Sequence, residues 1–199
     1  MKLVIATSNS GKITEISALL KNTGIEFISL INYPEMPEIT EDGTTFMENA
    51  LKKARETSVY TGYMSLADDS GLVVNALDGK PGVMSARFAT TTEARNKKLL
   101  YLLKNVRDDK RTARFVCALA LSGPDGFEWT TTGTCKGIIT LKPRGKGGFG
   151  YDPVFYYKPL GKTFAEISLE VKNQISHRGI ALKAFQKAVM VDGILGKVN

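Results

Sequence analysis

Residues 111–121 read RTARFVCALAL, and residues 122–126 read SGPDG. Apolar side chains alternate along the first stretch, which places five of them on one face of a strand: Ala113, Phe115, Cys117, Leu119 and Leu121. The Gly- and Pro-rich segment that follows is a strong hairpin turn. Its return strand is expected over residues 127–139. A long antiparallel hairpin is therefore the central element that the sequence predicts.

Strands and helices alternate before this hairpin. Strands are expected at residues 2–6, 26–30 and 65–67, and the third is expected to stop at residues 68–71. Helices are expected from Lys12, from a Thr45/Glu48 capping box to about Val59, over residues 91–104, and from about Arg178. The last helix is expected to bury Leu182, Phe185 and Val189. The pattern indicates a mixed α/β fold, and 199 residues suit a single domain of two closely packed lobes.

The composition is that of a soluble globular protein. Hydrophobic residues make up 43% of the chain and charged residues 24%. No apolar stretch approaches the ~18 residues that a membrane span needs. Residues 1–7 are too short for the core of a signal peptide. We therefore expect a cytoplasmic protein with no membrane partner.

Neither zinc nor nucleic acid is indicated. Cys117 and Cys135 form no C-x-x-C pair, and His177 is the only histidine, so a Cys/His zinc set is excluded. Cys117 lies in an apolar run and is expected to be a small core residue. The net charge of +7 is compatible with nucleic acid, with phosphorylated metabolites or with no anionic partner. Because the basic residues are scattered, we expect no nucleic-acid partner.

The turn between the first strand and helix is a candidate phosphate site, formed by Thr7, Ser8, Asn9, Ser10, Gly11 and Lys12. Backbone N–H groups and the helix dipole at such a turn bind phosphate, and the lysine adds a positive charge. It is not a Walker loop, because Ala6 and Ile13 stand where that motif needs Gly and Ser or Thr. The alternative is an ordinary polar turn with an N-cap.

Two adjacent acids, Asp68 and Asp69, follow an apolar strand. Burying them is costly unless something compensates their charge, and magnesium is a natural partner because it takes oxygen ligands and bridges to phosphate. Adjacent residues on an extended chain point in opposite directions, so the two acids are expected to have different roles. The alternative is that both cap the following turn.

Two further segments carry polar or aromatic groups suited to a ligand. In residues 147–153, glycines allow close backbone approach, and Phe149 between them offers a ring face to a base. The alternative there is a mobile surface loop. Lys172, His177 and Arg178 add hydrogen-bond donors near the start of the last helix. A Ser-His-Asp triad is disfavoured, because the chain contains no G-x-S-x-G elbow.

In their order along the chain, these segments resemble the inosine/xanthosine triphosphate pyrophosphatase family. The resemblance covers nearly the whole chain, apart from residues 90–109, and rests on these markers: Thr7-x-Asn9-x-x-Lys12, Glu41 to Thr44, Phe46, Glu48 to Ala50, Lys53, Ala67 to Leu72, Pro81 to Val83, Ser85 to Arg87, Gly147 to Pro153 and Ser176 to Gly179. It implies an elongated mixed sheet flanked by helices, two lobes with a central nucleotide cleft, and a homodimer.

The resemblance also implies roles for individual residues. Water would attack the α-phosphorus of a purine nucleoside triphosphate and release pyrophosphate, with Asp69 as general base and with Mg²⁺ held by Glu41 and Asp69. The phosphates would meet Lys12, Lys53, Lys172 and the backbone of residues 7–12 and Ser70. Phe149 would stack on the base, Asp152 would lie in the base pocket, and His177 and Arg178 would read the purine edge. Gly150 and Tyr151 would also bind the substrate.

Elementary chemistry is consistent with these roles. A carboxylate beside an attacking water is a workable base, especially if Asp68 nearby raises the pKa of Asp69. ITP, dITP and XTP carry a 6-oxo acceptor where adenine carries a donor, so donors aimed at O6 would discriminate against ATP. Two rival readings stay open. A phosphotransferase also uses lysines and magnesium but lacks support from a Walker or kinase motif, and a nucleic-acid-binding module rests on the net charge alone.

Overall fold

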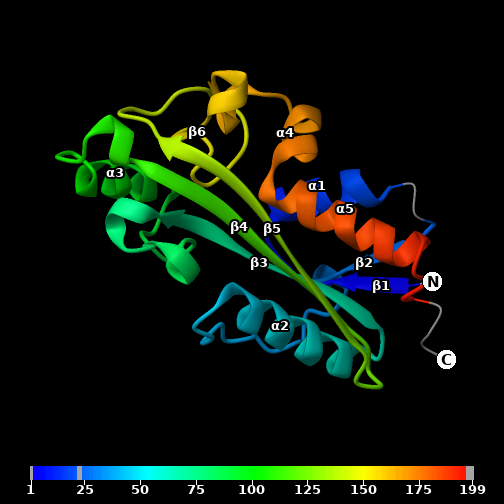
Figure 1. Cartoon of the computed structure of the whole chain (residues 1–199). Coiled ribbons are helices and arrows are strands. Elements are labelled where there is room, and N and C mark those ends of the chain that lie inside the picture. Colours follow the sequence, from blue (N-terminus) through cyan, green and yellow to red (C-terminus); the bar gives the residue numbers. More distant parts are fainter. Residues whose placement is uncertain (1, 22–23, 196–199) are drawn as a thin grey trace. The chain divides into compact units, whose positions relative to one another are not determined.

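Residues 2–21 and 24–195 are described by a computed structural model of the chain. The strands are β1 (Lys2–Ile5), β2 (Glu26–Ser29), β3 (Met64–Val74), β4 (Thr112–Ser122), β5 (Glu128–Ile139), β6 (Phe155–Tyr157) and β7 (Lys162–Thr163). The helices are α1 (Ser10–Leu20), α2 (Phe46–Thr61), α3 (Thr92–Leu102), α4 (Leu169–Ile175) and α5 (His177–Met190) (Figure 1).

The strands form one mixed sheet in the order β2-β1-β3-β4-β5-β6-β7. β1 pairs in parallel with β2 and β3, whereas β6 pairs antiparallel with β5 and β7. The α/β class expected from the sequence is therefore confirmed. Within the described part of the chain, no helix is long and apolar enough to cross a bilayer.

The chain divides into two compact units. The first contains Met1–Asp69, Cys117–Gly133 and Arg178–Asn199, and the second contains Ser70–Val116 and Thr134–His177. Each of β3, β4 and β5 therefore contributes one part to each unit. The central cleft and the homodimer stay predictions.

Both faces of the sheet are covered in the first unit. On one face, α1 and α5 pack against β1, β3 and β4 through large apolar side chains that include Leu3, Ile16, Leu66, Leu119 and Phe185. On the other face, the fully buried layer under α2 consists of alanines, with the partly buried Phe46, Met47 and Leu51 at its edge; the alanines are Ala6, Ala50, Ala54, Ala67, Ala118 and Ala120. Because successive side chains of a strand point to opposite faces, a leucine and the alanine after it serve different layers.

The alanine layer determines how near α2 comes to the sheet. Ala50 and Ala54 lie one turn apart on the helix and are fully buried, so only methyl groups separate the two backbones there. The helix begins with the expected capping box, in which Thr45 and Glu48 bond each other's backbone N–H, and it ends at Gly62 in the left-handed conformation. This close packing brings the polar side chains of α2 within reach of β3.

The second unit has its own apolar core. Its buried members come from the later part of β3, from α3, from the first part of β4, from the last part of β5 and from the segment around β6. They include Leu72, Leu99, Phe115, Ile139, Phe155 and Phe164. The buried guanidinium of Arg111 donates to the carbonyl oxygens of Leu103, Ile139 and Thr140 at 2.7–2.9 Å. Arg111 therefore ties the end of α3 to the end of β5.

The expected end of the third strand is wrong. β3 does not stop at Asp68 but continues without interruption to Val74. The strand can continue because both carboxylates find partners on either side of it, as the hydrogen bonds described below show. The reading in which both acids cap a turn is therefore excluded. The other expected elements are present with ends displaced by at most two residues, whereas β6, β7 and α4 were not anticipated.

The C-terminal helix buries its predicted residues with one difference. Leu182 and Phe185 are fully buried, but Val189 is only partly buried and Ala188 takes the deeper position. Ala188 and Val189 follow Phe185 by three and four positions, so both lie on the face of α5 that packs in this core.

Enlarging the alanine layer should separate α2 from the sheet. We expect Ala54→Leu to lower the free energy of unfolding by about 1–3 kcal/mol, because overpacking forces shifts of side chains and backbone. Urea denaturation measures this change. The control is Glu56→Leu, which places the same side chain on an exposed position of α2 and should stay within about 0.5 kcal/mol of the parent. Equal stability of both variants would show that the layer tolerates a larger spacing.

Candidate active site

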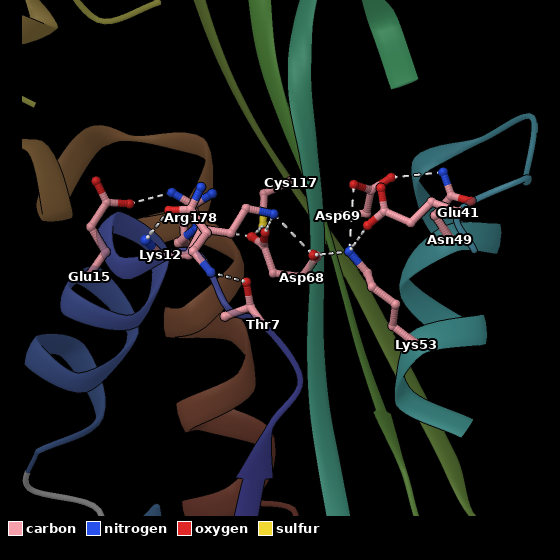
Figure 2. A network of polar contacts seen from close by, with 11 residues as sticks. Thr7, Lys12, Glu15, Glu41, Asn49, Lys53, Asp68, Asp69, Cys117 and Arg178 are labelled. Atoms are coloured by element: carbon pink, nitrogen blue, oxygen red, sulfur yellow. Dashed lines mark hydrogen bonds and ion pairs between the residues drawn. The ribbon is translucent and has the colours of Figure 1, made fainter. Parts of the chain in front are cut away.

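Strand β3 points Asp68 and Asp69 to opposite sides, as the sequence predicts (Figure 2). The Asp68 carboxylate meets side chains from α1, β4 and α5, whereas the Asp69 carboxylate meets α2. Both acids are buried. Because they face different neighbours, the two carboxylates have different surroundings and can serve different purposes.

Asp68 is held by cationic and thiol donors. Its Oδ1 pairs with Lys12 Nζ, and its Oδ2 accepts from Arg178 Nε at 2.9 Å and from Cys117 Sγ at 2.9 Å. Burial by itself would raise the pKa of Asp68, but the charges of Arg178 and Lys12 outweigh it and hold the pKa well below its usual value. Asp68 is therefore a permanently charged organising group.

Arg178 has a second acidic partner in Glu15 on α1. The guanidinium Nη1 pairs with Glu15 Oε2, and both side chains are almost fully buried. A buried arginine between two carboxylates is well compensated, and removing it would take a cation away from both of them, while Asp68 would keep Lys12. The resemblance implies that Arg178 reads the purine edge, and the guanidinium of Arg178 already binds two carboxylates.

Asp69 lies against α2. Its Oδ2 accepts from Asn49 Nδ2 at 3.1 Å, and its Oδ1 lies 3.8 Å from Lys53 Nζ. Burial raises the pKa of Asp69 above its usual value, against the opposing charges of Lys53 and Lys12, while Glu41 adds to the rise. The raised pKa agrees with the expectation for a general base, but its cause is burial and not Asp68.

Two lysines meet at the backbone between the acids. Lys12 Nζ donates to the carbonyl oxygen of Asp68 at 3.1 Å, and Lys53 Nζ donates to the same oxygen at 2.8 Å. The two ammonium groups come from different helices, α1 and α2. Their shared acceptor therefore brings two ammonium groups to one point of β3, where they also pair with Asp68 and Glu41, and ammonium groups are donors that can bind a polyphosphate.

Glu41 joins this group through Lys53. The lysine Nζ lies 2.5 Å from Glu41 Oε1, so one ammonium contacts both of the carboxylates expected to hold magnesium. Among residues 2–21 and 24–195, no cluster of three or more His, Cys, Asp or Glu side chains is suited to a metal ion. A pair of carboxylates fits Mg²⁺ when substrate phosphates and water complete its shell, which is the usual arrangement for this ion.

The predicted phosphate turn precedes α1 as expected. Asn9 caps the helix by accepting from Lys12 N at 3.1 Å, and Thr7 Oγ1 accepts from Asn9 N at 3.2 Å. Ser8, Asn9 and Ser10 are exposed. The structure thus presents an open helix N-terminus whose lysine reaches back to β3, a geometry compatible with anion binding.

In the second unit, Asp152, Lys172 and Phe149 come together. Asp152 Oδ2 pairs with Lys172 Nζ and accepts from Phe149 N at 2.8 Å, and the ammonium lies 4.6 Å from the centre of the Phe149 ring. Gly148, with φ of 69°, lies so close to Asp152 that a Cβ atom would collide with the carboxylate. Lys172 thus contacts the two residues that the resemblance assigns to the base.

The other predicted base-pocket residues lie in ordered surroundings. Asn96 Nδ2 donates to Gly150 O at 3.0 Å, and Tyr151 OH donates to Ser85 O at 2.9 Å. The His177 ring is buried and stacks on Phe115 with centroids 4.7 Å apart. Ser70 follows Asp69 in β3 and is half-buried. The loop around Phe149 is therefore packed against neighbouring segments at several points.

Sequence reasoning missed three partners of these residues. Asn49 belongs to a quoted marker but received no role, although its place one turn before Lys53 on α2 could have indicated that both face β3. Glu15, three residues after Lys12 on α1, is an acid on the apolar face of its helix. Cys117 is the buried core residue that was predicted, and it is also a hydrogen-bond donor to Asp68.

Comparison with known proteins gives one consistent result. The model of the Ham1 family matches residues 3–188. The dITP/XTP pyrophosphatase of Desulforamulus reducens is 52% identical over 186 residues, which cover 92% of each chain. That of Geobacter sulfurreducens is 50% identical over 196 residues, covering 97% of this chain and 98% of its own.

A solved structure agrees with the sequence matches. The HAM1 protein from Coxiella burnetii superposes with a TM-score of 0.88 at 41% identity, over 95% of this chain and 98% of that one. Because the family model matches nearly the whole chain and relatives share about half of its residues, this protein belongs to the Ham1 family.

Proposed function

We propose that this protein hydrolyses deaminated purine nucleoside triphosphates, namely ITP, dITP and XTP, to the monophosphate and pyrophosphate. The observation that carries the proposal is the group formed by Asp69, Glu41, Lys12 and Lys53, in which a buried carboxylate of raised pKa adjoins two converging ammonium groups. The name dITP/XTP pyrophosphatase carried by the relatives supports the substrate class.

In the proposed reaction, Asp69 accepts a proton from the attacking water. The water oxygen bonds to the α-phosphorus, the bond from that phosphorus to the oxygen of the β-phosphate breaks, and pyrophosphate leaves with the bonding electrons. Lys12 and Lys53, together with backbone N–H groups of residues 7–12 and Ser70, hold the phosphates and stabilise the charge that develops on their oxygens. Asp69 Oδ1 lies 3.8 Å from Lys53 Nζ, so the proposed base adjoins an ammonium group that is proposed to bind phosphate.

We propose Mg²⁺ as the cofactor, held by Glu41 and Asp69. These two carboxylates already share one cationic neighbour, Lys53, so their oxygens lie where a single positive charge can meet both. When bound, the ion would neutralise phosphate charge and polarise the phosphorus for attack. The ammonium group of Lys53 also attracts both carboxylates, which offsets part of the repulsion that Glu41 exerts on Asp69.

Residues of the second unit, together with Arg178 of the first, are proposed to bind the base. Phe149 offers its ring for stacking, and Asp152 with Gly150, Tyr151 and Lys172 forms its ordered surroundings. His177 and Arg178 are proposed to donate toward O6. Lys172 was expected at the phosphates, but its contacts with Asp152 and Phe149 favour a place with the base.

The same proposal covers location and assembly. An enzyme that acts on free nucleoside triphosphates would work in the cytoplasm, with neither nucleic acid nor membrane as a partner. The homodimer is proposed because the resemblance implies it. Light scattering of the purified protein tests the dimer.

A turnover screen of ITP, dITP, XTP, GTP and ATP with magnesium, with both products identified, tests the reaction. Transfer of a phosphate group to an acceptor, without release of pyrophosphate, would favour a phosphotransferase instead.

Asp69→Asn removes the proposed base while keeping the shape of the side chain. We expect turnover of ITP to fall by about 100-fold or more, because general-base catalysis contributes on that scale. Thermal denaturation should show that the variant still folds. Asp78→Asn, on an exposed turn of the second unit, is the matched control and should keep parental turnover. Near-parental turnover in Asp69→Asn would exclude the proposed base.

Lys53→Ala removes an ammonium proposed to bind phosphate. We expect kcat/KM for ITP to fall by about 10- to 150-fold, the effect of losing a hydrogen bond to a charged group. Arg55→Ala deletes a positive charge two positions along α2, where the guanidinium pairs with Glu128, and serves as control. If both variants lose the same factor, the effect is one of general charge and not of the Lys53 position.

Selectivity separates the proposed base-binding residues. Arg178→Lys keeps a positive charge between Asp68 and Glu15 but lacks the planar fork, so kcat/KM for ITP should fall about 10- to 150-fold more than for ATP. Phe149→Ala should reduce both substrates by similar factors, because every purine can stack. Equal losses on ITP and ATP in Arg178→Lys would assign the reading of the base to other residues.

A further inference from the structure

Asn49 on α2 contacts two parts of the site at once. Its Nδ2 donates to Asp69 Oδ2 at 3.1 Å, and its Oδ1 accepts from Gly43 N at 2.8 Å. The side chain is completely buried, with 0% exposure. Figure 2 shows its amide directed at the Asp69 carboxylate from the same helix that supplies Lys53.

The orientation of this amide follows from its partners. The backbone N–H of Gly43 is a donor, so the amide oxygen must face it, and the NH₂ group is then left to face Asp69. Residue 43 must be a glycine in this arrangement, since a Cβ atom there would lie 2.6 Å from Asn49 Oδ1 and 2.8 Å from Glu48 Cβ. The loop and the amide therefore hold each other in one arrangement.

We propose that Asn49 is a positioning residue that fixes the rotation of the Asp69 carboxylate and ties it to the loop carrying Glu41. The inference rests on the proposed role of Asp69 as base and adds a residue to which no role has been given. By engaging Oδ2, the amide turns Oδ1 toward Lys53 and Glu41, which is the side of the proposed phosphate and metal groups.

The physical reason is that a carboxylate group rotates easily about the bond that carries it. The terminal torsion of an aspartate is broad, so an unrestrained carboxylate rotates between positions of similar energy. A donor on rigid α2 removes this freedom before substrate arrives. Loss of such supporting hydrogen bonds behind a reactive or metal-binding group costs about 10- to 100-fold in activity, because small displacements of the reacting atoms are costly.

Two substitutions test the proposal, one of the same volume and one that is apolar and larger. Asn49→Asp keeps an acceptor for Gly43 N but replaces the donor facing Asp69 by a second carboxylate, and Asn49→Leu removes both hydrogen bonds without adding charge. We expect kcat for ITP to fall about 10- to 100-fold in each, with KM within about threefold, because substrate binding is retained while the base is misplaced. Asn75→Asp, the same change at an exposed position of the second unit, is the control and should keep parental kinetics.

The Asp69→Asn background separates this inference from the proposed function. Asn49→Leu added to Asp69→Asn should reduce kcat no further, since its effect passes through that carboxylate. The exchanged pair Asn49→Asp/Asp69→Asn restores a donor opposite an acceptor, so it should melt at a higher temperature than Asn49→Asp alone while staying inactive. A parental kcat in Asp69→Asn would remove the proposed base, whatever Asn49 does.

The inference itself is overturned by any of three results. These are a parental kcat in both Asn49 variants, an additive loss of kcat in the Asp69→Asn background, and failure of both single variants to fold. The last would make Asn49 a purely structural residue. If Asn49→Asp alone fails to fold, the uncharged Asn49→Leu decides the question by the same comparison of kcat with KM.

Discussion

Burial of the Asp68 carboxylate is the constraint on which the first unit depends. An ionised carboxylate cannot be buried inside a protein at tolerable cost unless cations and hydrogen bonds replace its water. Lys12 from α1, Arg178 from α5 and Cys117 from β4 supply that replacement, so three elements distant in the chain must converge on β3. The requirement for charge compensation thus fixes where Lys12 lies, and with it the start of α1.

On the opposite face of the sheet, Asp69 has different surroundings. Asp69 is buried beside an amide and a lysine, and there the effect of burial outweighs that of the cations, so the pKa of Asp69 is raised. What makes this possible is the layer of alanines under α2, since a helix held away by larger side chains could not bring Asn49 and Lys53 to β3. Adjacent acids therefore acquire opposite pKa shifts, because the charges of Arg178 and Lys12 outweigh burial at Asp68, whereas burial outweighs the charges of Lys53 and Lys12 at Asp69.

Much of the fold followed from local patterns, and less of the site did. The alternation around Phe115, the Gly-Pro turn after Ser122 and the capping box at Thr45 are signals contained within a few residues, and each predicted its element. The end of β3 was misjudged because nothing within residues 66–71 reveals that Arg178, more than a hundred positions later, compensates Asp68. Asn49 and Glu15 were missed for the same reason, since a buried amide or acid is recognisable only beside its partner.

The two-sided character of β3 limits how the chain can vary in length. Ile5 pairs with Leu66, and this alignment sets which way the next residues point. A single-residue insertion or deletion between Leu66 and Asp68 would exchange the two faces, turning one acid away from its cations and the other away from α2. Homologous chains should therefore accept gaps in the loops on either side of β3 but not within it, and the length of this strand becomes as restricted as the identity of its acids.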